Sequence, residues 1–77
     1  MDIYKESINL AENLNKYGHQ VISQEIFDAI NYSSTGTEAL MRIRFVLKDF
    51  LGRDVGSNFQ LLEGVKNVLN KINAMID

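Results

Sequence analysis

The chain contains no cysteine, no proline and no tryptophan among its 77 residues, and each absence limits what the protein can be. Without cysteine there is no disulfide and no thiolate metal site, so helix packing, a partner or self-association must stabilise a domain this small. Without proline, breaks between elements must come from glycine and from clusters of serine, threonine and asparagine. The lack of cysteine is also compatible with a reducing cytoplasm, where we expect this protein to act.

Long apolar runs are missing as well. No stretch is long enough to cross a bilayer, and residues 1–6 have neither the basic nor the apolar region of a secretion signal. We therefore expect no membrane-embedded segment. A chain of this length has room for one hydrophobic core, so residues 1–77 are predicted to form a single domain.

The net charge is only −2, but it is unevenly distributed along the chain. Residues 1–38 contain six acidic residues and two lysines, whereas residues 39–77 contain six basic and four acidic residues. Two halves of opposite sign can neutralise each other across the fold, or they can orient an approaching partner. Both interpretations stay open at the level of the sequence.

Apolar residues recur at helical spacing in all four segments that the glycines and polar clusters delimit. No segment alternates with period two beyond a few residues, which argues against strands. The spacing predicts helices over about residues 2–17, 19–32, 36–51 and 58–76. The protein is thus predicted to be all-α, either a small four-helix bundle or a compact orthogonal array of four short helices.

Local signals support these boundaries. The segment Thr35-Gly36-Thr37-Glu38 matches a capping box, and Ser57-Asn58-Phe59-Gln60 repeats the same logic before the last helix. Gly18 stands where a left-handed residue would end the first helix. The predicted core stripes of the four helices are Ile3, Leu10, Leu14 and Tyr17; Ile22, Ile26, Ala29 and Ile30; Ala39, Leu40, Ile43, Val46, Leu47, Phe50 and Leu51; and Leu61, Leu62, Val65, Val68, Leu69, Ile72, Met75 and Ile76.

Residues suited to catalysis or metal binding are scarce. His19 is the only histidine, and local geometry brings no serine or carboxylate to it, so a capping or surface role is expected. Glu25 and Asp28 offer only two carboxylates on one exposed face, too few for a metal site. The stretch 52–56 lacks the preceding strand and the lysine of a phosphate loop. We therefore predict a protein that is not an enzyme and that uses no cofactor and no metal.

The third predicted helix has a second apolar feature outside its core stripe. Met41 and Phe45 are four residues apart and should lie side by side, flanked by Arg42, Arg44 and Lys48. Either this helix is central and buries both faces, or the pair is an interface anchor with a polar rim.

Three more aromatic residues fall outside the stripes of their helices, and together they favour a partner surface or a homodimer: Phe27, Tyr32 and Phe59.

A DNA-binding function is the alternative. The second and third predicted helices could form a helix-turn-helix that presents the basic residues Arg42, Arg44 and Lys48. However, Asp28 and Glu38 bracket the turn and would repel phosphates. The connection 31–36 is also longer than the turn of that motif. Nucleic-acid binding is therefore ranked below protein binding.

The segment from Thr35 to Lys48, TGTEALMRIRFVLK, stands in a short, acidic, asparagine-rich helical chain and resembles the small all-α immunity proteins that bacteria encode beside toxins of interbacterial competition. The resemblance covers about a fifth of the chain. It implies stoichiometric binding that occludes or distorts a cognate toxin, without turnover. It assigns no functional residue, so the predicted partner-binding residues follow from the pattern alone: Met41, Phe45, Arg42, Arg44 and Lys48.

Overall fold

The computed structural model describes residues 2–53 and 58–76 of the chain. It contains helices α1 (Ile3–Lys16), α2 (Gln20–Tyr32), α3 (Gly36–Gly52) and α4 (Phe59–Ile76). No strand occurs within those two ranges. The all-α prediction is confirmed, and each predicted helix agrees with the observed one to within a residue at either end.

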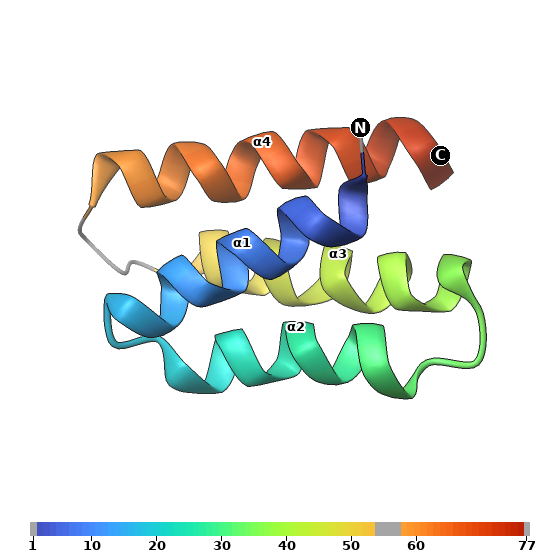
Figure 1. The fold of residues 1–77 in the computed structure, drawn as a ribbon. Coiled ribbons are helices and arrows are strands. Elements are labelled where there is room, and N and C mark those ends of the chain that lie inside the picture. The colour runs from blue at the N-terminus through green and yellow to red at the C-terminus, as the bar shows by residue number, and fades with distance from the viewer. Residues whose placement is uncertain (1, 54–57, 77) are drawn as a thin grey trace.

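The four helices run alternately in opposite directions, and each packs against two neighbours (Figure 1). Around the molecule, α1 contacts α2, α2 contacts α3, α3 contacts α4, and α4 returns to α1. Helix α1 crosses the others obliquely, whereas α2, α3 and α4 lie along similar directions (Figure 1). The molecule measures 32 × 22 × 22 Å. Of the two predicted arrangements, the structure is the antiparallel bundle, as short connections favour.

The capping box at the start of α3 forms with one change. Thr35 Oγ1 accepts a hydrogen bond from the Glu38 amide at 3.1 Å, as predicted. The Glu38 carboxylate reaches one residue further back and accepts from the Ser34 amide at 3.2 Å. The first bond satisfies a backbone donor that the first turn of a helix leaves without an internal partner, and the second satisfies the Ser34 amide just before the helix. The first turn of α3 is therefore held in place by its own side chains.

The other boundary signals are also informative. Gly18 has a φ of 91°, the left-handed conformation predicted for it at the end of α1. At the start of α4, the Asn58 side chain accepts from the Leu61 amide at 3.1 Å. The predicted cap placed Ser57 first, and that residue lies outside the described ranges. Asn58 supplies the side-chain cap that the structure shows.

All four helices contribute to one apolar core. Its buried members are Ile3, Leu10, Ala11 and Leu14 of α1, Ile26 and Ala29 of α2, Leu40, Ile43, Val46, Leu47 and Phe50 of α3, and Leu61, Val65, Val68, Leu69 and Ile72 of α4. Two residues predicted for the core stripes are exposed instead, Tyr17 and Met75. Both lie at helix ends, Tyr17 as the C-cap of α1 and Met75 in the last turn of α4, where fewer neighbours cover a side chain.

None of the described helices combines the length and the apolar composition that crossing a bilayer requires.

Candidate partner-binding surface

Met41 and Phe45 lie on the surface of α3. Their side chains are 51% and 73% exposed, whereas the core stripe of the same helix, from Ala39 to Phe50, is buried. The interpretation that α3 buries both of its faces is therefore wrong. Single exposed apolar residues are common on proteins, but here two large ones lie one helical turn apart on the same face of α3.

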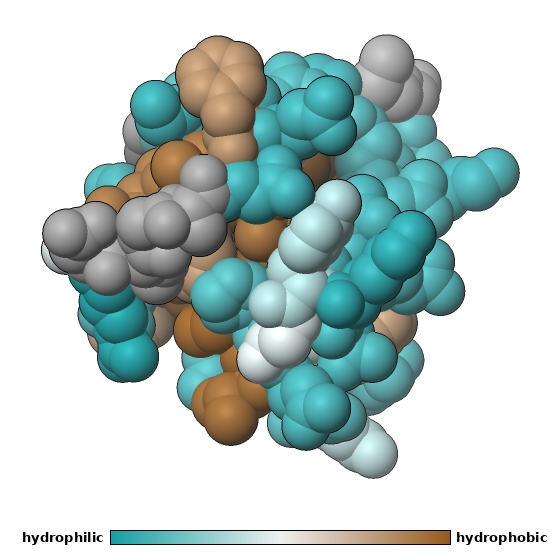
Figure 2. Space-filling view, turned by 90° about the vertical axis from the view of Figure 1, so that its left-hand side faces the viewer, coloured by the Kyte–Doolittle hydropathy of each residue, from teal (hydrophilic) through white to brown (hydrophobic). Residues whose placement is uncertain are grey.

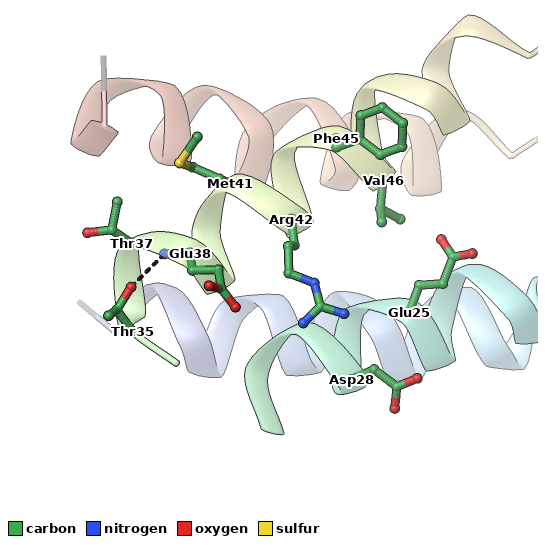
Figure 3. A pocket seen from close by; sticks show the side chains of 9 residues that line it. All are labelled: Glu25, Asp28, Thr35, Thr37, Glu38, Met41, Arg42, Phe45 and Val46. Carbon is green, nitrogen blue, oxygen red and sulfur yellow. Dashed lines mark hydrogen bonds between the residues drawn. The ribbon is translucent and has the colours of Figure 1, made fainter. Parts of the chain in front are cut away.

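A groove of about 710 Å³ runs beside this pair, between α2 and α3. We call it the α2–α3 groove, and Figure 3 shows the side chains around it. Val46, which is 8% exposed, contributes a nearly buried apolar patch to its lining. The complete lining consists of Glu25 and Asp28 from α2, Thr35 from the connection, and Thr37, Glu38, Met41, Arg42, Phe45 and Val46 from α3.

Helical spacing explains why these side chains meet. Glu38, Met41, Arg42 and Phe45 occupy positions i, i+3, i+4 and i+7 of α3, so they share one face. On α2, Glu25 and Asp28 are three residues apart and share a face as well. The antiparallel packing of α2 against α3 brings these two faces to the same side of the bundle.

Arg42 is the basic residue of the groove. Its side chain extends from α3 toward α2, with Glu38 on one side and Glu25 on the other (Figure 3). The guanidinium donates a hydrogen bond to the Ser33 hydroxyl at 3.1 Å. Within the described part of the chain it forms no ion pair with the carboxylates near it. Arg42 thus reduces the negative charge of the groove without forming an ion pair with any one of its carboxylates.

The predicted basic rim is only partly brought together. Arg42 lines the α2–α3 groove, but Arg44 and Lys48 do not. At about 100° per residue, Arg44 and Lys48 lie on the opposite flank of the Met41–Phe45 pair from Arg42. Arg44 is half-buried and Lys48 is exposed.

The three acidic residues of the groove, Glu25, Asp28 and Glu38, were not assigned to the site from the sequence. Their spacing within each helix was visible, but only the packing of α2 on α3 shows that they face the same groove. The α2–α3 groove therefore carries three acidic residues and one basic residue, where a basic rim was predicted.

The aromatic residues outside the core stripes do not gather at the groove. Phe27 is half-buried and packs against the core. Tyr32 and Phe59 are exposed at 77% and 73%, and neither lines the α2–α3 groove. Apolar side chains also reach the surface at one end of the bundle, in small groups among polar ones (Figure 2). The predicted surface is therefore reduced to the Met41–Phe45 pair and the groove beside it.

The geometry of α2 and α3 bears on the DNA-binding alternative. The connection consists of residues 33–35 only, so the argument that it is too long for a helix-turn-helix is wrong. A different feature separates this pair from that motif. The two helices lie antiparallel along their length (Figure 1), whereas helix-turn-helix pairs meet at about 90–120°.

Among the described residues, the structure gives His19 a packing role and shows no metal site. His19 occupies the N-cap position of α2, but its side chain makes no capping hydrogen bond. Its ring packs edge-on against Phe50, with 5.0 Å between ring centroids, so it serves packing and the capping role is wrong. Among the described residues, no three acidic or histidine side chains are grouped as a metal site requires.

No protein-family model, no curated protein and no solved structure matches this chain.

Proposed function

We propose that this protein works by binding a partner protein through the α2–α3 groove, with Met41 and Phe45 as the central contacts and without catalysing a reaction. The observation that supports this most strongly is the exposure of the two side chains, 51% and 73%, on a helix whose own core stripe is complete without them. A fold that needs neither side chain for its core gains little from keeping them apolar unless something covers them.

The expected energetics agree with a small interface. Burial of apolar surface contributes about 25 cal/mol per Å², and aromatic residues at the centre of an interface often cost about 2 kcal/mol or more when truncated. Phe45 is the larger of the two exposed side chains and the more exposed one, so it should contribute most. Arg42 can add a hydrogen bond to the partner because no carboxylate in the described ranges holds it.

The resemblance of residues 35–48 to bacterial immunity proteins supplies a class of partner. Under this proposal the partner is a toxin, and binding in the α2–α3 groove occludes or distorts it in a one-to-one complex. The lack of cysteine is compatible with the cytoplasm as the compartment of this binding. The groove residues Met41, Arg42 and Phe45 all lie within that segment.

Phe45→Asp tests the proposal. The tagged protein is used to capture proteins from a lysate of its native host, and the partner should be lost with Phe45→Asp because a carboxylate cannot be buried in an apolar contact without a large desolvation cost. Phe59→Asp is the matched control, because Phe59 is also 73% exposed but lies outside the groove. It should capture the partner as the unmodified protein does.

Circular dichroism of both variants completes the test. Both should keep the helical spectrum of the unmodified protein, since neither replaced side chain belongs to the core. If Phe45→Asp unfolds the protein, Phe45 contributes to folding and the proposed contact is wrong. Equal capture by the folded Phe45→Asp variant would also contradict the proposal.

A further inference from the structure

The charge around the α2–α3 groove indicates what kind of partner segment fits it. Three carboxylates line the groove, Glu25, Asp28 and Glu38, and one cation, Arg42, stands among them. Building on the function proposed above, we propose that the occupant is an amphipathic helical segment of the partner whose polar face is basic. The sequence pattern alone, by contrast, favours an acidic occupant, because the basic residues Arg42, Arg44 and Lys48 flank the exposed pair.

The carboxylates of the groove can form ion pairs with a partner, because none of them has one within the described ranges. The Glu25 side chain makes no hydrogen bond or ion pair to any described residue, and it is exposed. Asp28 accepts one hydrogen bond, from the neutral Gln24 amide at 2.9 Å. Glu38 accepts from the Ser34 backbone at 3.2 Å. None of the three is neutralised by an ion pair within the described ranges, so cations brought by a partner would find unpaired acceptors.

The apolar residues of the groove indicate the apolar stripe that the partner helix should carry. Met41 and Phe45 form one edge, and Val46 offers a nearly buried patch beside them. From Thr35 to Val46 the groove follows α3 for roughly 16 Å, at about 1.5 Å per residue. That length matches about three turns of a helix. A helix lying along the groove can place an apolar stripe on these residues and basic side chains toward Glu25 and Asp28, as amphipathic helices do in apolar grooves.

Two synthetic helical peptides of 15 residues serve as the probes. Both have leucines at helical i, i+3 and i+4 spacing, and the remaining positions are lysine in one peptide and glutamate in the other. Fluorescence anisotropy of the labelled peptides measures binding to the protein. We expect the leucine–lysine peptide to bind and the leucine–glutamate peptide not to bind, because only the first offers cations to the groove.

Charge reversal assigns that binding to the groove. The double variant Glu25→Lys/Asp28→Lys should lower the affinity for the leucine–lysine peptide by about tenfold or more at low salt, since charges at the rim of an interface steer association. The matched control is Glu12→Lys/Glu63→Lys, which changes the net charge equally and replaces exposed acids of α1 and α4 outside the groove. The control should change the affinity by less than about threefold. Glu25→Gln/Asp28→Asn gives a milder version of the same test should the lysine pair unfold the protein.

Four results would overturn the proposal, and the last of them leaves protein binding itself intact. Equal weakening by the groove pair and by the control pair would mean that the peptide senses only the overall charge. Equal or tighter binding of the leucine–glutamate peptide would mean that the groove prefers anions. A dimer in sedimentation equilibrium that Phe45→Ala dissociates would assign the groove to a second copy of this chain. If the peptides fail while Phe45→Asp still abolishes capture of a partner, protein binding stands and only the basic chemistry of the partner is wrong.

Discussion

The two opposite sides of the bundle use similar helices in different ways. Between α1 and α4, Lys71 Nζ donates to Glu6 Oε1 at 2.7 Å, and their side chains are only 35% and 23% exposed. Between α2 and α3, Arg42 donates to a serine hydroxyl, and the carboxylates near it have no ion pair within the described ranges. The α1–α4 side thus contains an ion pair between its helices, whereas the carboxylates of the α2–α3 groove have none among the described residues. Opposite charge in the two halves of the sequence therefore served internal pairing at one place and left a polar groove at another.

Apolar residues follow the same division. Gly64 of α4 faces α1 so closely that a Cβ built on it would lie 3.6 Å from Leu10 Cδ1. The surface hollows beside Gly64 measure about 210 and 490 Å³, and both are lined mainly by polar residues. On the other side, Met41 and Phe45 remain exposed beside a groove of about 710 Å³. The close packing of α1 on α4 contributes to stability, whereas a groove with an exposed apolar edge is suited to binding.

The largest expected contrast is between Ile72→Ala and Phe45→Ala. Ile72 is fully buried in α4, so its truncation should lower the free energy of unfolding by about 2–5 kcal/mol. Phe45→Ala should change it by less than about 0.5 kcal/mol, because the ring is already in water. Urea unfolding followed by circular dichroism measures both. A loss of several kcal/mol for Phe45→Ala would remove the distinction between the two sides.

A smaller loss of stability is expected when the Thr35 cap at the start of α3 is removed. Thr35→Ala removes the hydroxyl that accepts from the Glu38 amide and should lower the free energy of unfolding by about 1 kcal/mol. Thr37→Ala is the control, because Thr37 is also exposed and lines the groove but makes no hydrogen bond to a described side chain. Urea unfolding should therefore show little change for that variant. Equal losses for both threonines would mean that the cap contributes nothing specific.

The smallest expected change is a gain in stability where α4 packs against α1. Gly64→Ala should raise the free energy of unfolding by about 0.5–1 kcal/mol, because alanine favours the helix and its methyl would meet Leu10 at an ordinary contact distance. Thermal unfolding should show a higher Tm, while capture of a partner stays unchanged. A lower Tm would show that α1 and α4 have no room for the methyl group.

The sequence was sufficient for the all-α class and the helix boundaries, because each helix carries its own start and stop signals, but it left the choice between a bundle and an orthogonal array open. Gly18 predicted the end of α1, and Thr35 predicted the start of α3, since both act through backbone groups a few residues away. Periodicity also separated the core stripe of α3 from Met41 and Phe45. Met75 shows the limit of periodicity, because spacing along a helix does not reveal that its last turn is uncovered.

The groove could be predicted only in part. Met41, Phe45 and Arg42 were identified because they are neighbours on a single helix. Glu25 and Asp28 were not, because their distance from Arg42 depends on how α2 packs against α3. Arg44 and Lys48 were assigned to the same rim because they are close in sequence, yet helical rotation places them on the other flank of the exposed pair.

Binding in the α2–α3 groove should change the surroundings of Met41, which lines the groove, more than those of Met75, which does not. Met41 and Met75 are matched reporters, because both are exposed, at 51% and 58%, and only Met41 lines the groove. The direct measurement is a methyl NMR spectrum of the protein labelled with ¹³C-methyl methionine, recorded with and without the captured partner. The Met41 signal should shift or broaden, and the Met75 signal should stay in place. A change at Met75 with an unaltered Met41 signal would contradict the account.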